Sequence, residues 1–166
     1  MVCVAALATS VWISAAPEEA PAASAPHPGQ VVLDPGAEPS PDELAATDYL
    51  AKQGHRVRLL RRDPASRDRQ PDAQLDDDDF PTEIKTVSNI TSDDVSGRLA
   101  GRIREALGQA PSVVVDARKQ RELTQAIIES AMKRGYGMAR KDQKSIKRIR
   151  VLGPDGEDIN WDYTNE

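Results

Sequence analysis

The stretch SVVVDA, residues 112–117, constrains the fold of this chain more than any other. It is a short, continuous run of apolar and mostly β-branched residues, which is typical of a strand at the centre of a sheet, covered on both faces. Amphipathic helical patterns precede and follow it, at residues 91–110 and 119–137. A buried strand between two such helices is typical of sheets whose strands are joined by helical crossovers.

The chain before this strand contains a well-marked helix at residues 40–54. Ser40 suits the N-cap and Pro41 suits the first helical position. Glu43 completes a capping box with Ser40, because its side chain can accept a hydrogen bond from the N-cap backbone. Gly54 ends the helix.

Four further segments predict strands. Residues 55–61 alternate polar and apolar side chains, as a half-buried strand does. Residues 72–75 and 80–87 predict two strands of a hairpin across an aspartate-rich turn, and a proline places the start of the second strand near Thr82. Residues 145–163 predict a strand, a Pro-Asp-Gly turn and a short return strand. The order α-β-β-β-α-β-α-β predicts an α/β fold, with a mixed central sheet and helices on both faces.

Three details of the later helices can be checked against the structure. Thr91 or Ser92 is expected to cap the helix at residues 91–110. Gly97 and Gly101, four residues apart, are expected to allow this helix to approach the sheet closely. Gly135 is expected to end the helix that follows the central strand.

The chain divides at about residue 40. Residues 1–39 combine an apolar N-terminal segment with a Pro/Ala-rich linker that is expected to be disordered, and residues 40–166 form the folded domain. The opening MVCVAALATSVWISAAPEEA resembles a signal peptide, but no Lys or Arg precedes Lys52, so a fragment of a longer protein is an equal interpretation. A zinc site built on cysteines is excluded, because Cys3 is the single cysteine of the sequence.

Positive charge is concentrated in one part of an otherwise acidic chain. The formal net charge is −5, yet residues 91–150 hold 14 Lys and Arg against 7 Asp and Glu. Such a segment can track the phosphates of a nucleic acid, and it can equally keep amphipathic helices soluble. The candidate nucleic-acid-binding residues are Arg98, Arg102, Lys119, Lys147 and Arg148.

The predicted hairpin carries the residues with the clearest chemical meaning. Asp72 begins its first strand, and Glu83 and Lys85 lie in phase on the second, on the face opposite Ile84. Carboxylates at this spacing can hold Mg²⁺ or Mn²⁺, and a lysine beside them can assist attack on a phosphodiester. The alternative is a solvated Glu–Lys ion pair on an ordinary strand.

These residues resemble a known superfamily. The pattern PD at 71–72 followed by EIK at 83–85 resembles the PD-(D/E)XK nucleases, and residues 40–152 look like the C-terminal tRNA nuclease toxin domains of contact-dependent growth inhibition proteins. The resemblance implies a restriction-endonuclease-like fold and cleavage of tRNA in competing cells, neutralised by a cognate immunity protein. It assigns metal binding to Asp72 and Glu83, catalysis to Lys85, and a supporting catalytic role to Glu43.

The resemblance also implies delivery by secretion or from a cell surface and action in the cytoplasm of the target cell. The domain is expected to be a monomer with no stable membrane association. Two features depart from the family's pattern. The aspartates at 76–79 add negative charge to the predicted turn, and no long delivery protein precedes the domain in this sequence. A DNA nuclease of the same fold and a non-catalytic binding module remain alternative functions.

Overall fold

The computed structural model describes residues 29–66, 68, 70–76, 80–88, 90 and 94–163. Within these ranges a sheet of seven strands is accompanied by three helices. The strands are β1 (Gln30–Leu33), β2 (Arg56–Leu59), β3 (Ala73–Leu75), β4 (Thr82–Thr86), β5 (Ser112–Asp116), β6 (Arg148–Leu152) and β7 (Asp158–Asp162). The helices are α1 (Pro41–Lys52), α2 (Val95–Leu107) and α3 (Gln125–Lys141).

The sheet is mixed, as the sequence predicts. Its strands lie side by side in chain order, with β1 parallel to β2, β3 antiparallel to both of its neighbours, and β7 antiparallel to β6. Strands β4, β5 and β6 are parallel, and α2 and α3 form the crossovers between them. The predicted α/β class is therefore confirmed.

Strand β5 occupies the centre of the structure. All five of its residues are buried. Val113 and Val115 belong to the core formed with α2 and α3, whereas Val114 belongs to the core formed with α1. The continuous apolar run thus has the predicted cause, because helices cover both faces of this strand.

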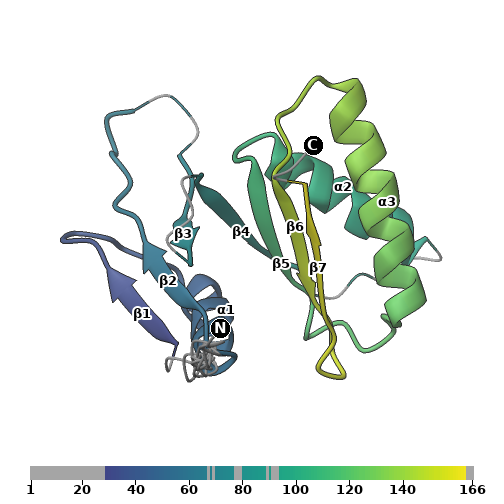
Figure 1. Ribbon diagram of the computed structural model, residues 1–166, viewed down its shortest axis with the longest axis horizontal. Helices are drawn as coiled ribbons and strands as arrows, with labels where there is room; N and C mark the ends of the chain where they lie inside the picture. The colour runs from purple at the N-terminus through teal and green to yellow at the C-terminus, as the bar shows by residue number, and fades with distance from the viewer. Residues whose placement is uncertain are drawn as a thin grey trace, which may run out of the picture.

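The helices divide between the two faces of the sheet. Figure 1 shows α1 beside β1 and β2, and α2 with α3 together beyond β5, β6 and β7. Gly135 does not end α3, which continues to Lys141. A Cβ on Gly135 would lie 2.8 Å from a side-chain carbon of Ile103, so this glycine lets α3 approach α2 closely. No helix of the described ranges is long and apolar enough to cross a membrane.

Two other local predictions are wrong or lie outside the described residues. A Cβ on Gly101 would meet open space, so Gly101 does not bring α2 close to the sheet. The N-cap of α2 is Asp94, whose side chain accepts a hydrogen bond from the backbone of Gly97. Thr91 and Ser92, the predicted caps, lie outside the described residues.

Strand β1 was missed by the sequence analysis, which assigned its residues to a disordered linker. It pairs in parallel with β2 over its full length at the edge of the sheet. A four-residue strand between proline- and glycine-containing segments gives almost no periodic signal. The sheet therefore begins before residue 40, and residues 1–28 lie outside the described part of the chain.

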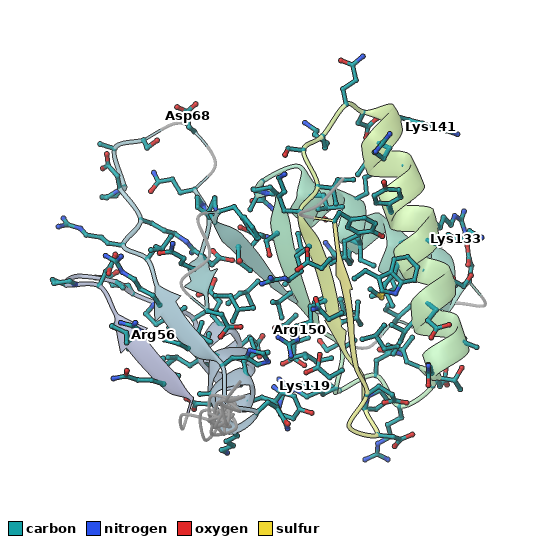
Figure 2. The ribbon with its side chains drawn as sticks, viewed as in Figure 1. Arg56, Asp68, Lys119, Lys133, Lys141 and Arg150 are labelled. Atoms are coloured by element: carbon teal, nitrogen blue, oxygen red, sulfur yellow. The ribbon has the colours of Figure 1, made fainter. Side chains whose placement is uncertain are left out.

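On the α1 side of the sheet, the side chain of Arg150 of β6 joins β7 to the residue that precedes β2. This buried side chain donates to both carboxylate oxygens of Asp158, each at 2.7 Å, and to Nε2 of His55 at 2.6 Å. His55 directly precedes β2, and its Nδ1 lies 2.6 Å from a carboxylate oxygen of Asp76. Figure 2 shows Arg150 in the interior, between the β1–β2 end of the sheet and β6. Because arginine can only donate, Nε2 of His55 is the acceptor here.

Candidate active site

Asp72 is held at the point where the two hairpin strands diverge. Strands β3 and β4 pair at Ala73 and Thr82, and Asp72 precedes β3. One carboxylate oxygen of Asp72 accepts a hydrogen bond of 2.9 Å from the backbone N–H of Ile84. The side chain is 3% exposed, so it is fixed against β4 rather than placed on a free turn.

Glu83 and Lys85 lie next to each other on β4, as predicted from the strand period. The ammonium of Lys85 is 2.6 Å from one carboxylate oxygen of Glu83. Ile84 packs in the α1 core, so both charged side chains face the α2 side of the sheet. The Glu83 side chain is 3% exposed, and its second oxygen is buried without a hydrogen-bond partner among the described residues.

Burial raises the pKa of Glu83 above its ordinary value of 4.5. The hydrogen bond from Lys85 opposes this shift, the negative charge of Asp72 adds to it, and the positive charge of Arg62 opposes it. The carboxylates of Glu83 and Asp72 are therefore electrostatically coupled, although they come from different strands. A buried carboxylate with a raised pKa is a common feature of functional sites.

The raised pKa predicts that Glu83→Gln stabilises the metal-free protein as pH rises. A raised pKa means that the folded state binds a proton on Glu83 more tightly than the unfolded state does, so the stability from that proton is fully present below pH 4.5 and is lost as pH rises through the folded pKa. Glutamine does not ionise, so the melting temperature of the variant, relative to that of wild type, should be higher at pH 8 than in acid. Thermal melts in EDTA at both pH values test this, and a relative melting temperature that is lower at pH 8 than in acid would contradict it.

Glu43 serves both the helix and the site. Its backbone N–H donates to the Ser40 side chain at 3.3 Å, and one of its carboxylate oxygens accepts from the Ser40 backbone at 2.7 Å, which confirms the capping box. Its other carboxylate oxygen lies 2.5 Å from Nη2 of Arg62. The local and the functional interpretations of Glu43 are therefore compatible.

Arg62 is the site residue that the sequence analysis missed. Its Nη2 atom donates to Glu43 and also to Asp72. Burial alone lowers the pKa of Arg62, but the hydrogen bonds and charges of Asp72 and Glu43 outweigh it and raise the pKa above its ordinary value. Arg62 lies in the segment between β2 and β3, outside any periodic pattern. A signal that could have found it is the excess of arginine in residues 56–62, opposite an acidic hairpin.

The acidic residues of the site meet the requirements of a divalent metal ion in part. Within the described residues, no group of three or more His, Cys, Asp or Glu side chains is already arranged to hold a metal. Arg62 stands between Glu43 and Asp72, and Lys85 takes one oxygen of Glu83. The unpaired buried oxygen of Glu83 and the anionic oxygens of Asp72 are nevertheless the hard ligands that Mg²⁺ and Mn²⁺ prefer.

Two cavities border these residues. The first, of about 300 Å³, is lined by residues that include Glu43, Arg62 and Asp72. The second, of about 590 Å³, lies where β4 ends, between the residues that follow Lys85 and helix α2, and Arg98 and Arg102 line it.

The five predicted nucleic-acid-binding residues lie in two regions. Arg98 and Arg102 line the second cavity. The ammonium of Lys119 is 3.0 Å from Asp42, the residue before Glu43, and Figure 2 labels this lysine. Lys147 and Arg148 lie at the amino end of β6, where Arg148 is in register with Ser112 and the backbone N–H of Lys147 donates to the carbonyl of Pro111. The five residues therefore do not form one cluster, and their binding of nucleic acid stays a prediction.

The aspartate run of the hairpin turn lies only partly in the described residues. Asp76 accepts hydrogen bonds from His55 and from the backbone of Arg56, which fixes the start of β2. Asp77, Asp78 and Asp79 lie outside the described residues. Asp76 therefore has a structural function on the side of the hairpin away from Asp72.

Comparison with known proteins gives a match at the level of the fold. No protein-family model matches the sequence, and no curated protein matches it. The structure is similar to one chain of the CdiA-CT/CdiI toxin and immunity complex from Burkholderia pseudomallei, with a TM-score of 0.54 and 14% sequence identity. The match covers 81% of this chain and 100% of that chain. At this identity, the similarity establishes a shared fold.

Proposed function

We propose that this chain is a toxin domain of the contact-dependent growth inhibition type, and that it is a PD-(D/E)XK-type, metal-dependent endoribonuclease that cleaves tRNA. The observation that carries the proposal is the convergence of Asp72, Glu83, Lys85 and Glu43 around one diverging hairpin. A structural ion pair on a strand requires neither the buried Asp72 nor the arginine that joins Asp72 to Glu43 of the first helix. The similarity in fold to a chain of a toxin and immunity complex supports the same proposal.

The site residues divide the chemistry among them. Asp72 and Glu83 would hold a Mg²⁺ or Mn²⁺ ion, with Glu43 as an additional acid from α1. Such an ion, when bound, polarises the phosphate and lowers the pKa of a bound water. Lys85 is 29% exposed, so its ammonium can reach substrate and stabilise negative charge that develops on the phosphate. The buried carboxylate of Glu83 keeps Lys85 in position through their contact of 2.6 Å.

A nucleic-acid substrate is supported by the basic side chains beside this site. Arg98 and Arg102 line the cavity at the end of β4, and Lys119 lies beside the start of α1. Cations on both sides of a catalytic centre can bind the phosphates that flank the bond to be cut. RNA is proposed over DNA on the strength of the resemblance to tRNA nuclease toxins, and a cleavage assay on tRNA and on plasmid DNA distinguishes the two substrates.

The biological setting follows from the same proposal. The similar chain comes from a complex of a toxin with its immunity protein. We therefore propose a cognate immunity protein as a partner for this chain, and delivery from the producing cell to the cytoplasm of a competitor. The domain is proposed to act as a monomer.

Growth inhibition tests this proposal in cells. Induced synthesis of the full chain in a bacterial host that lacks the immunity gene should stop growth and deplete intact tRNA, as seen on a denaturing gel of total RNA. The Asp72→Asn variant, made at the same level, should leave growth and tRNA unchanged. Equal toxicity of the two proteins, or arrest with intact tRNA, would show that this site does not cleave tRNA.

A further inference from the structure

A single guanidinium joins two acids from separate parts of the fold. Nη2 of Arg62 contacts Glu43 at the start of α1 and Asp72 in front of β3. The two carboxylates share one positive charge, and they would repel each other at this separation without it. Arg62 therefore stabilises the arrangement of acids on which the proposed function rests.

The acids are anchored more firmly than the arginine. The second oxygen of Asp72 accepts from the backbone of Ile84, and the second oxygen of Glu43 accepts from the backbone of Ser40. The side chains of Asp72 and Glu43 are 3% and 13% exposed, whereas the side chain of Arg62 is 50% exposed. Arg62 is thus the member of the group that can move into water at least cost, because a long charged side chain on the surface is readily solvated.

The charges of the site are unbalanced in the present arrangement. In the ion pairs of the described residues, Glu43, Asp72 and Glu83 contact two cations, Arg62 and Lys85, which leaves one formal negative charge among these five side chains. With a divalent ion in place of the Arg62 guanidinium, the two charges of the ion and the one charge of Lys85 would equal the three negative charges of the acids. The buried second oxygen of Glu83 has no partner among the described residues, so Lys85 does not saturate this carboxylate.

We propose that Arg62 is a built-in counter-ion of the acidic site, and that a divalent metal ion binds by displacing its guanidinium from Glu43 and Asp72. This inference rests on the proposed function, in which these acids hold Mg²⁺ or Mn²⁺. Arg62 is a positioning residue in this scheme: it keeps the ligands together in the metal-free protein and competes with the metal for them. Removal of Arg62 should therefore strengthen metal binding, the opposite of what removal of a helper residue would do.

Calorimetric titration of the full chain with Mn²⁺ in the absence of substrate tests this competition. The Arg62→Gln variant should bind Mn²⁺ at least about tenfold more tightly than wild type. The matched control is Arg134→Gln, because Arg134 is an exposed arginine of α3 that pairs with Asp94 and does not line the cavity of Glu43, Arg62 and Asp72; its Kd should equal that of wild type. Asp72→Asn in the Arg62→Gln background should remove the gain in Mn²⁺ affinity, because the carboxylate of Asp72 is then no longer present to bind the metal.

Metal-free stability gives a second readout. In EDTA the Arg62→Gln variant should melt below wild type, since the two acids then lack a counter-ion, and Mn²⁺ should raise its melting temperature more than that of wild type. If Arg62→Gln does not fold, Arg62→Lys replaces it, because lysine keeps the charge but lacks the planar fork of the guanidinium. Its Kd for Mn²⁺ should lie between the value of wild type and the value expected for Arg62→Gln.

The outcomes separate the inference from the proposed function. If Arg62→Gln and Arg62→Lys bind Mn²⁺ as tightly as wild type or more weakly, the proposed role of Arg62 is wrong, whereas the proposed metal site is still supported. Absence of Mn²⁺ binding in wild type and in all variants overturns the proposed metal chemistry, and the role of Arg62 with it.

Discussion

Replacement of Lys85 by alanine should reduce the rate of RNA cleavage at least about a hundredfold, because loss of one preformed charge donor at a reacting centre costs about 10²–10³ in rate. The ammonium of Lys85 contacts Glu83 directly, and it lies on the strand that carries the site. The loss should appear in kcat more than in KM, since the charge acts where negative charge develops on the phosphate. Single-turnover cleavage of a labelled tRNA measures it.

Two controls accompany this measurement. Lys133→Ala removes an exposed lysine of α3, outside the candidate site, and should leave the rate unchanged. Lys85→Ala combined with Glu83→Gln removes the buried carboxylate that would otherwise lose its partner, so a fold defect in the single variant can be recognised by its repair in the double variant. A Lys85→Ala protein that is folded and cleaves at the wild-type rate would show that Lys85 is half of a structural ion pair.

Replacement of Arg150 by alanine should lower the free energy of unfolding by about 3 kcal/mol, the scale found when one partner of a buried ion pair is removed. Arg150 makes two hydrogen bonds to Asp158 and one to His55, and its side chain is 8% exposed. The variant would leave Asp158 without its cation and His55 without its donor, in the contact that joins β6 to β2. Urea unfolding followed by tryptophan fluorescence, with Trp161 on β7 as a reporter, gives the value.

The matched comparison is Arg134→Ala. Arg134 pairs with Asp94 at 3.4 Å, and both side chains are more than half exposed, so this loss should stay below about 1 kcal/mol. A similarly small loss for Arg150→Ala would contradict the interpretation that the buried contacts of Arg150 with Asp158 and His55 stabilise the fold.

Local patterns in the sequence were sufficient to predict the strand-borne part of the site. The strand period of two residues places Glu83 and Lys85 on one face of β4 opposite Ile84, and the structure agrees. The capping box of Ser40 and Glu43 follows from a four-residue motif and is confirmed. The start of β4 at Thr82 is also confirmed, because the proline before it limits pairing.

Features that depend on distant partners were not accessible in the same way. Arg62 has no local pattern, since its function comes from two acids, 19 residues before it and 10 residues after it in the chain. Gly135 was interpreted as a helix end from its residue type, whereas contact with Ile103 of another helix explains it. Strand β1 is defined by its pairing with β2 rather than by its four residues.

The most direct test of the central claim is a cleavage assay of the full chain on tRNA, with plasmid DNA as a separate substrate, in Mg²⁺, in Mn²⁺ and in EDTA. The account predicts discrete cleavage products from tRNA in either metal, no products in EDTA, and intact plasmid throughout. Cleavage of the plasmid alone would support the nuclease site and would show that its substrate is DNA and not tRNA. Cleavage that continues unchanged in EDTA, or no cleavage of either nucleic acid in any condition, would contradict the claim that Asp72, Glu83 and Lys85 form a metal-dependent nuclease centre.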